Sequence, residues 1–197
     1  MYALVEDNNI TKLINNSKSL VIGDVRYPAK IFSLWSKSEL EAIGIYEVIT
    51  DSSNKKDEQW YINTNESYAF ADNQVTRSWG TATAKPHADV TQTINEVEYI
   101  TPGLKTKLIK DLKITVANEL AKTDWYITRN TEKSTAIPSA ISTHRDAVRT
   151  KQAEMETAIT NASDTPALET LHTYVNTGTE ENPVMTRPLG ELPTLES

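Results

Sequence analysis

The spacing of apolar residues changes near residue 103, and this change constrains the fold more than any other feature of the sequence. Before that point, short β-prone stretches alternate with turn residues, as in strands joined by tight connections. After it, an apolar residue recurs every fourth position, which places the run on one face of an α-helix: Leu104, Leu108, Leu112, Val116 and Leu120. The sequence therefore predicts an α+β protein, β-rich in its N-terminal part and helical in its C-terminal part.

We expect four consecutive segments along the 197 residues, a length that suits two small domains. Residues 1–86 are predicted to form a β-rich, antiparallel docking domain with one short helix, and residues 87–103 a linker that ends in Thr-Pro-Gly. Residues 104–176 are predicted to form a helical hairpin domain. Residues 177–197 are predicted to form an extended C-terminal arm, because glycines and prolines break any periodicity there.

Local signals place several elements in the N-terminal part. Residues 2–6 and 10–13 have the pattern of two strands joined by a tight turn, and Asp72-Asn73 is typical of a second such turn. Ser36 and Glu39 have the S-x-x-E spacing of a capping box, in which each side chain bonds the backbone amide of the other residue. We therefore expect the short helix to begin there.

The helical part should contain two long helices and a short third one. The second helix is predicted to run from Ser139 to Asn161, after a polar and turn-rich segment. The third helix would be capped by Asp164 and carry Pro166 in its first turn. The second helix should bury one stripe of side chains: Ile141, His144, Val148, Met155 and Ile159.

Charge and composition exclude several functions. A formal charge of −7 and a pI near 5.1 argue against nucleic-acid binding, because phosphate contacts need clustered lysine and arginine. The chain has no cysteine, which excludes disulfides and thiolate metal sites. No stretch is apolar enough for a membrane span, and the first residues lack the pattern of a signal peptide. We expect a protein made in the cytoplasm that does not span a membrane.

The sequence offers no recognisable catalytic, cofactor or metal site. His87, His144 and His172 are far apart and lack the spacing that places two metal ligands on one helix face. No phosphate-binding glycine motif is present. The acidic pairs Asp57-Glu58 and Glu180-Glu181 lie in loop-like stretches, where nothing is predicted to desolvate one carboxyl group and raise its pKa. We therefore expect no enzyme activity and no cofactor.

Aromatic residues gather in the N-terminal part and have two interpretations. They could stack on sugars or bases, as in a carbohydrate-binding or hydrolytic protein, or they could form the core of a sheet. Their period-two spacing favours the core. The residues are Trp60, Tyr61, Tyr68, Phe70 and Trp79.

Two stretches of the helical part carry a family resemblance. One is Thr123-Asp124-Trp125, and the other is His144-Arg145-Asp-Ala-Val148-Arg149, with Arg129 and Ala136-Ile-Pro138 between them. They resemble the C-terminal region of the phage tail assembly chaperone-like family, in which one helix ends in T-D-W and the next carries Y-R-x-x-[LV]-R. Here His144 replaces the tyrosine.

The resemblance implies structural roles for four residues. Trp125 would plug between the two helices. Arg145 or Arg149 would pair with Asp124 or with the carbonyl groups that end the first helix. These roles maintain the hairpin and are not catalytic.

The N-terminal part also carries a resemblance, in Tyr27-Pro-Ala29, Leu34-Trp35-Ser36, Ile43-Gly-Ile45 and Thr81-Ala-Thr-Ala-Lys-Pro86. These stretches resemble N-terminal domains of tail-fibre-associated and other virion proteins of marine tailed phages. Together the two resemblances imply a non-enzymatic structural protein of a phage tail, either a tail fibre or a fibre adaptor that joins the tail to the host-recognition apparatus.

The resemblances also imply partners and a location. The chain would contact other phage tail proteins in a symmetric multi-copy assembly within the virion tail, and it would contact the host surface. The alternative is a tail or tail-fibre assembly chaperone, which binds its partner during morphogenesis and is absent from the mature virion. A chaperone should be mobile after Asn176, whereas a virion part should hold its C-terminal arm in order.

Overall fold

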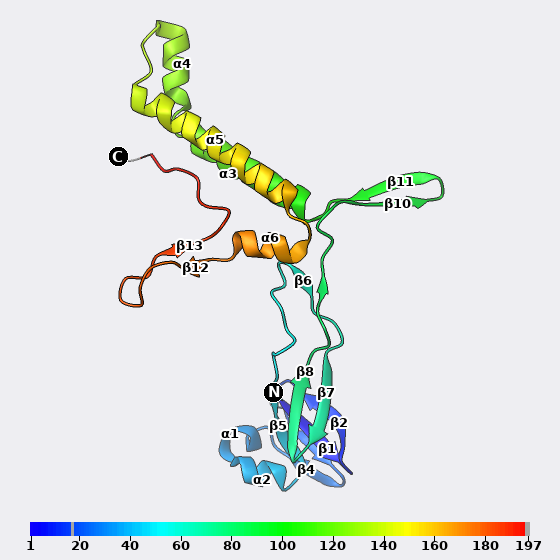
Figure 1. Ribbon diagram of the computed structural model, residues 1–197. Helices are drawn as coiled ribbons and strands as arrows, with labels where there is room; N and C mark the ends of the chain where they lie inside the picture. The colour runs from blue at the N-terminus through cyan, green and yellow to red at the C-terminus, as the bar shows by residue number, and fades with distance from the viewer. Residues whose placement is uncertain (17, 196–197) are drawn as a thin grey trace. The chain divides into compact units, whose positions relative to one another are not determined.

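The computed structural model describes residues 1–16 and 18–195 and consists of two compact units, Met1–Thr83 and Ala84–Ser197 (Figure 1). Strands dominate the first unit and helices the second, so the predicted α+β class is confirmed. The boundary between the units lies near residue 86, where the sequence places the end of the docking domain. Among the described residues, no helix is both long and apolar enough to cross a membrane.

The first unit is built on a five-stranded sheet with the order β2-β1-β5-β8-β7. Most neighbours are antiparallel, but β5 and β8 run parallel, so the prediction of an antiparallel domain is wrong at this pair. A parallel pair needs a long crossover, and here the chain between β5 and β8 supplies one. The strands are β1 (Tyr2–Glu6), β2 (Asn9–Ile14), β5 (Ile45–Thr50), β7 (Ser67–Ala71) and β8 (Gln74–Ser78).

Both predicted tight turns of this sheet are confirmed. Asp7 and Asn8 join β1 to β2 with φ of 49° and 61°, and Asp72 and Asn73 join β7 to β8 with φ of 52° and 55°. Two consecutive residues with positive φ give the turn geometry whose twist matches that of the flanking strands, and Asp and Asn tolerate it well.

The sequence predicts one short helix in this unit, and its described residues form two, α1 (Ile31–Leu34) and α2 (Lys37–Glu41). The predicted capping box starts α2, since Glu39 N donates to Ser36 Oγ at 3.4 Å and Ser36 N donates to Glu39 Oε2 at 2.7 Å. By contrast, α1 has no side-chain cap, so no such sequence signal marks its start.

Both faces of the sheet bury apolar side chains, because successive residues of β1 point to opposite sides. Leu4 packs with Ile31 of α1 and Leu40 of α2, whereas Ala3 and Val5 pack with Val75 of β8 on the other face. The unit also contains the short strands β3 (Leu20–Ile22), β4 (Val25–Tyr27) and β6 (Tyr61–Ile62), and β9 (Thr83–Ala84) spans its boundary with the second unit.

The second unit begins with an antiparallel hairpin of β10 (Val90–Ile94) and β11 (Val97–Thr101) (Figure 1). The segment predicted as a linker, residues 87–103, therefore contains regular structure. Its turn has positive φ at Asn95 and at Glu96, and glutamate is not a typical residue for this position, which explains why the sequence signal is weak.

Two long antiparallel helices, α3 (Leu104–Ala121) and α5 (Ser139–Asn161), pack side by side in this unit (Figure 1). The predicted bounds of α5 and its buried stripe are confirmed. Between them lies α4 (Asp124–Lys133), which the sequence does not predict and which takes up the first part of the segment 130–136 predicted to be turn-rich. Because α4 fully buries none of its residues, it has no apolar periodicity from which it could be predicted.

The chain continues through α6 (Thr165–His172), whose predicted cap is confirmed because Ala167 N donates to Asp164 Oδ1 at 2.8 Å. The C-terminal arm follows, and its described residues contain no helix and one short strand, which pairs with a strand just before the arm. Strands β12 (Val175–Asn176) and β13 (Met185–Thr186) pair, and Leu189 is buried. Residues 196–197 of the predicted arm lie outside the described part.

Candidate functional site

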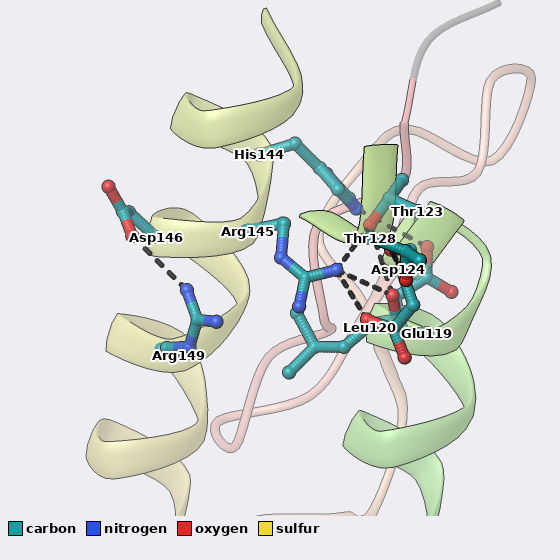
Figure 2. A network of polar contacts seen from close by, with 9 residues as sticks. All are labelled: Glu119, Leu120, Thr123, Asp124, Thr128, His144, Arg145, Asp146 and Arg149. Atoms are coloured by element: carbon teal, nitrogen blue, oxygen red, sulfur yellow. Dashed lines mark hydrogen bonds and ion pairs between the residues drawn. The ribbon is translucent and has the colours of Figure 1, made fainter. Parts of the chain in front are cut away.

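The candidate site is the junction where α5 meets the end of α3, and Arg145 is its central residue. The antiparallel packing of α3 and α5 brings this residue to the last turn of α3 (Figure 2). Its Nη1 donates to Leu120 O at 2.7 Å, to Thr123 Oγ1 at 2.7 Å and to Asp124 Oδ1 at 2.9 Å. The Arg145 side chain is only 10% exposed, so the guanidinium is bound inside the hairpin.

The positive charge of Arg145 interacts favourably with the carbonyl groups at the end of α3. The last carbonyl groups of a helix lack partners within the helix and carry partial negative charge, so a cation is stabilising there. Leu120 O accepts from Arg145 and also from the hydroxyl group of Thr123, at 3.0 Å. The hydroxyl of the fully buried Thr123 thus donates to Leu120 O and accepts from Arg145 Nη1.

Of the two predicted arginines, only Arg145 reaches Asp124. Arg149 lies one turn further along α5, and its Nη1 donates to Asp146 Oδ1 at 3.3 Å on the helix surface (Figure 2). The alternative in which Arg149 pairs with Asp124 or with the end of α3 is therefore wrong.

The expectation that Trp125 plugs between the two helices is also wrong, because its side chain is 52% exposed. The smaller Thr123 takes the buried position at the junction, and Trp125 begins the outer surface of α4. There its ring packs on Tyr126, with ring centroids 4.1 Å apart, and the guanidinium of Arg129 lies 4.6 Å from the Trp125 ring centroid.

A second polar contact lies beside the first. His144 Nε2 is 3.4 Å from Glu119 Oε1 but lacks hydrogen-bond geometry, and this buried nitrogen has no other partner among the described residues (Figure 2). The pKa of Glu119 is lowered, chiefly by the hydrogen bond from Lys122 and further by the charges of Lys122 and His144. The Glu119 carboxylate thus lies between Lys122, just after α3, and His144 of α5.

A cavity of about 350 Å³ lies between the long helices and the C-terminal arm. Leu189 and Arg187 of the arm line it, together with His172 at the end of α6, whose pKa is lowered mainly by burial. Arg187 Nε lies 2.7 Å from Glu191 Oε1, so these two charged residues of the arm form an ion pair with each other. No group of three or more histidine or acidic side chains in the described part of the chain is placed to hold a metal ion.

The aromatic residues of the first unit mostly form core. Trp60, Tyr61 and Trp79 are buried, and Phe70 packs on Tyr46 with ring centroids 4.8 Å apart. The hydroxyl of Tyr68 donates to Glu66 at 2.6 Å. The carbohydrate-binding interpretation therefore loses the exposed aromatic surface that it requires.

Sequence reasoning missed the contribution of Tyr126 to the surface of α4. Trp125 and Arg129 have the i,i+4 spacing that brings side chains together on a helix, and Tyr126 is adjacent. That signal becomes visible only when residues 124–133 are known to be helical.

Comparison with protein-family models, with curated proteins and with solved structures finds no match to this chain. What the protein does must therefore be inferred from its own residues.

Proposed function

We propose that this chain is a non-enzymatic structural component of a bacteriophage tail, a tail-fibre or fibre-adaptor protein that joins the tail to the host-recognition apparatus. It would act in several symmetric copies within the virion and contact other tail proteins and the host surface. The β-rich unit would dock on the tail, and the helical unit would bind a neighbour.

The observation that carries the proposal is the convergence of Thr123, Asp124 and Arg145. These residues belong to the two motifs that resemble the phage family. Thr123 and Asp124 precede Arg145 by 22 and 21 residues along the chain, yet one guanidinium nitrogen of Arg145 donates to both. A chance likeness in sequence gives no reason for the matched residues to meet in space.

The direction of Arg145 supports a structural role. All three of its acceptors belong to the end of α3 and the start of α4. A catalytic arginine would point its donors toward bound substrate, whereas this one uses Nη1 to fix the geometry of the hairpin.

The alternative is an assembly chaperone that leaves before the virion matures. It is favoured by the nature of the family that the two motifs resemble. Against it stands the C-terminal arm, which a free chaperone should leave mobile after Asn176. In the described residues the arm folds back, and Leu189 N donates to Leu171 O at 3.0 Å.

Mass spectrometry of purified, salt-washed particles of the phage that encodes the chain distinguishes the two. We expect peptides of this protein at a fixed ratio to those of a tail-tube protein from the same particles. The salt wash removes proteins that adhere through weak charge contacts. Absence from particles together with abundance in the infected-cell lysate would leave the chaperone. Absence from both would contradict each role.

A further inference from the structure

Three residues of α4 form an aromatic and cationic cluster, Trp125, Tyr126 and Arg129, which we call the α4 cluster. Trp125 is 52% exposed, and the other two are half-buried. The Arg129 guanidinium lies 4.6 Å from the Trp125 ring centroid and 5.5 Å from that of Tyr126. Tryptophan, tyrosine and arginine are the residues most enriched where protein partners bind tightly. The α4 cluster contributes little to the core, since α4 fully buries no residue.

Arg129 indicates the chemistry of the partner. Among the described residues it has no hydrogen bond and no ion pair, and its Nε is enclosed without an acceptor. A stacked guanidinium is held in place and keeps its fork of donors ready for a carboxylate. The complementary surface should therefore carry carboxylates next to apolar side chains that can cover the two rings.

The loop between β12 and β13 of the same sequence carries such a surface. Glu180 and Glu181 are exposed, and no described residue pairs with them in an ion pair. Beside them, Val184 is 53% and Met185 is 56% exposed. Methionine sulfur contacts aromatic rings favourably, so Met185 suits the rings of the α4 cluster.

This loop is ordered before any partner binds. Asn176 Oδ1 accepts from Gly178 N at 3.0 Å and from Val184 N at 2.9 Å, and Thr177 N donates to Val184 O at 2.8 Å. A surface that is already held in its bound shape loses less conformational entropy on association.

We propose that the chain assembles head to tail, with the β12–β13 loop of one copy bound to the α4 cluster of a second copy. The two surfaces differ, so the contact is heterologous and can propagate into a ring or an open filament. One loop on one helix face is a small interface, and the association of two copies should be weak and dependent on concentration. Ring closure would strengthen it, because later contacts become intramolecular.

Sedimentation velocity of the purified full chain over a range of concentrations tests this. We expect wild type to associate at high concentration. Trp125→Ala with Arg129→Ala, and separately Glu180→Ala with Glu181→Ala and Met185→Ser, should each weaken association at least tenfold. These residues are outside the cores, so circular dichroism should show unchanged helix content in both variants. Tyr99→Ala, which truncates a similarly exposed aromatic residue on β11, is the matched control and should associate like wild type.

Mixing the two variants provides the decisive measurement. Each keeps the surface that the other lacks, so a one-to-one mixture should form a heterodimer and go no further. A monomeric wild type, association that survives in either variant, a mixture that stays monomeric, or loss of association in Tyr99→Ala would each overturn the proposal. This inference deepens the proposed multi-copy role and rests on it for its biological meaning, but its test uses only purified chain and can fail independently of the particle measurement.

Discussion

Arg145 and Arg149 are one turn apart on the same helix but differ in burial and in hydrogen-bond partners, the two properties that decide how much an arginine contributes to stability. Arg145 is buried and gives charge-assisted bonds to three acceptors, while Arg149 is more than half exposed and pairs with an exposed aspartate. Burial raises the value of each hydrogen bond and the cost of losing it, whereas solvent screens the surface pair.

We predict that Arg145→Ala lowers the free energy of unfolding by about 2–4 kcal/mol, because it removes the buried guanidinium that donates to Leu120 O, Thr123 Oγ1 and Asp124 Oδ1. Arg149→Ala should change it by less than about 0.5 kcal/mol. Urea denaturation followed by circular dichroism measures both. Equal losses in the two variants would contradict the structural role of Arg145.

Gly44 and Gly23 offer a second pair at the same scale. Both have positive φ, +79° and +56°, but a Cβ on Gly44 would lie 2.6 Å from Val5 O, whereas one on Gly23 would meet nothing within 4 Å. We expect Gly23→Ala to cost about 1–2 kcal/mol from backbone strain alone. Gly44→Ala should cost clearly more, because β1 must also shift. Similar melting temperatures for the two variants would show that β1 accommodates the added methyl group without loss.

Among the elements, the C-terminal arm lies beside a titrating group, His172. Burial lowers the pKa of His172, the charge of Arg187 adds to this, and the hydrogen bond with Leu168 O opposes it. Because the pKa of His172 is lower in the folded state than in the unfolded state, the unfolded state binds the proton more tightly. Stability is therefore full above about pH 6.5, the unfolded pKa, and decreases as the pH falls below that value.

We predict that the arm opens more often at pH 5 than at pH 7.5. The amide of Leu189, which donates to Leu171 O, reports the opening by hydrogen exchange once rates are corrected for intrinsic pH dependence. His172→Gln should abolish most of the difference. If the difference persists in that variant, another group controls the arm.

A carboxylate at the base of the β10–β11 hairpin joins its two ends. Asp89 Oδ1 accepts from Gly103 N at 2.8 Å and from Thr106 Oγ1 at 2.6 Å, and these bonds lower the pKa of Asp89. A two-stranded hairpin is only marginally stable by itself in water.

Asp89→Ala should therefore speed amide exchange throughout β10 and β11 while leaving the middle of α3 protected. Glu98→Ala, on β11 and away from the base, is a suitable control and should have little effect. Unchanged protection of the hairpin in Asp89→Ala would mean that its own cross-strand pairs are sufficient.

At the scale of the whole molecule, the first unit has hydrophobic clusters of its own. The clusters around Leu4 and Val75 lie entirely within the first unit. We predict that fragments 1–83 and 84–197 each unfold cooperatively in urea, with far-ultraviolet circular dichroism spectra that add up to that of the full chain. A fragment that shows no cooperative transition would mean that its unit needs the other to fold.

Turns and helices were predictable from the sequence wherever neighbouring residues carry the pattern that determines them. The turn residues gave the two tight turns of the sheet, the capping pair Ser36 and Glu39 gave α2, and the period-four apolar run gave the helical hairpin. The parallel β5–β8 pair was not predictable, because pairing between strands distant in sequence leaves no periodic mark on either strand.

The candidate site was likewise predictable only in part. The motifs identified Arg145 and Asp124, but only the structure shows that Thr123 is buried and Trp125 exposed, since both residues follow closely on the end of α3. Without an apolar stripe, α4 itself could not be recognised, and neither could the face it gives to Trp125, Tyr126 and Arg129.

The parallel pair of β5 and β8 has a consequence for the protein during its synthesis. Strands β1, β2 and β5 can assemble once Thr50 has left the ribosome, but β5 then waits for Ser78 with one edge unpaired. At roughly 5–20 residues per second, this delay is about one to six seconds. During that interval each nascent chain exposes a strand edge to which other unfinished chains can bind. Crowding of ribosomes on one messenger, as in heavy expression, would therefore reduce the yield of correctly folded first units.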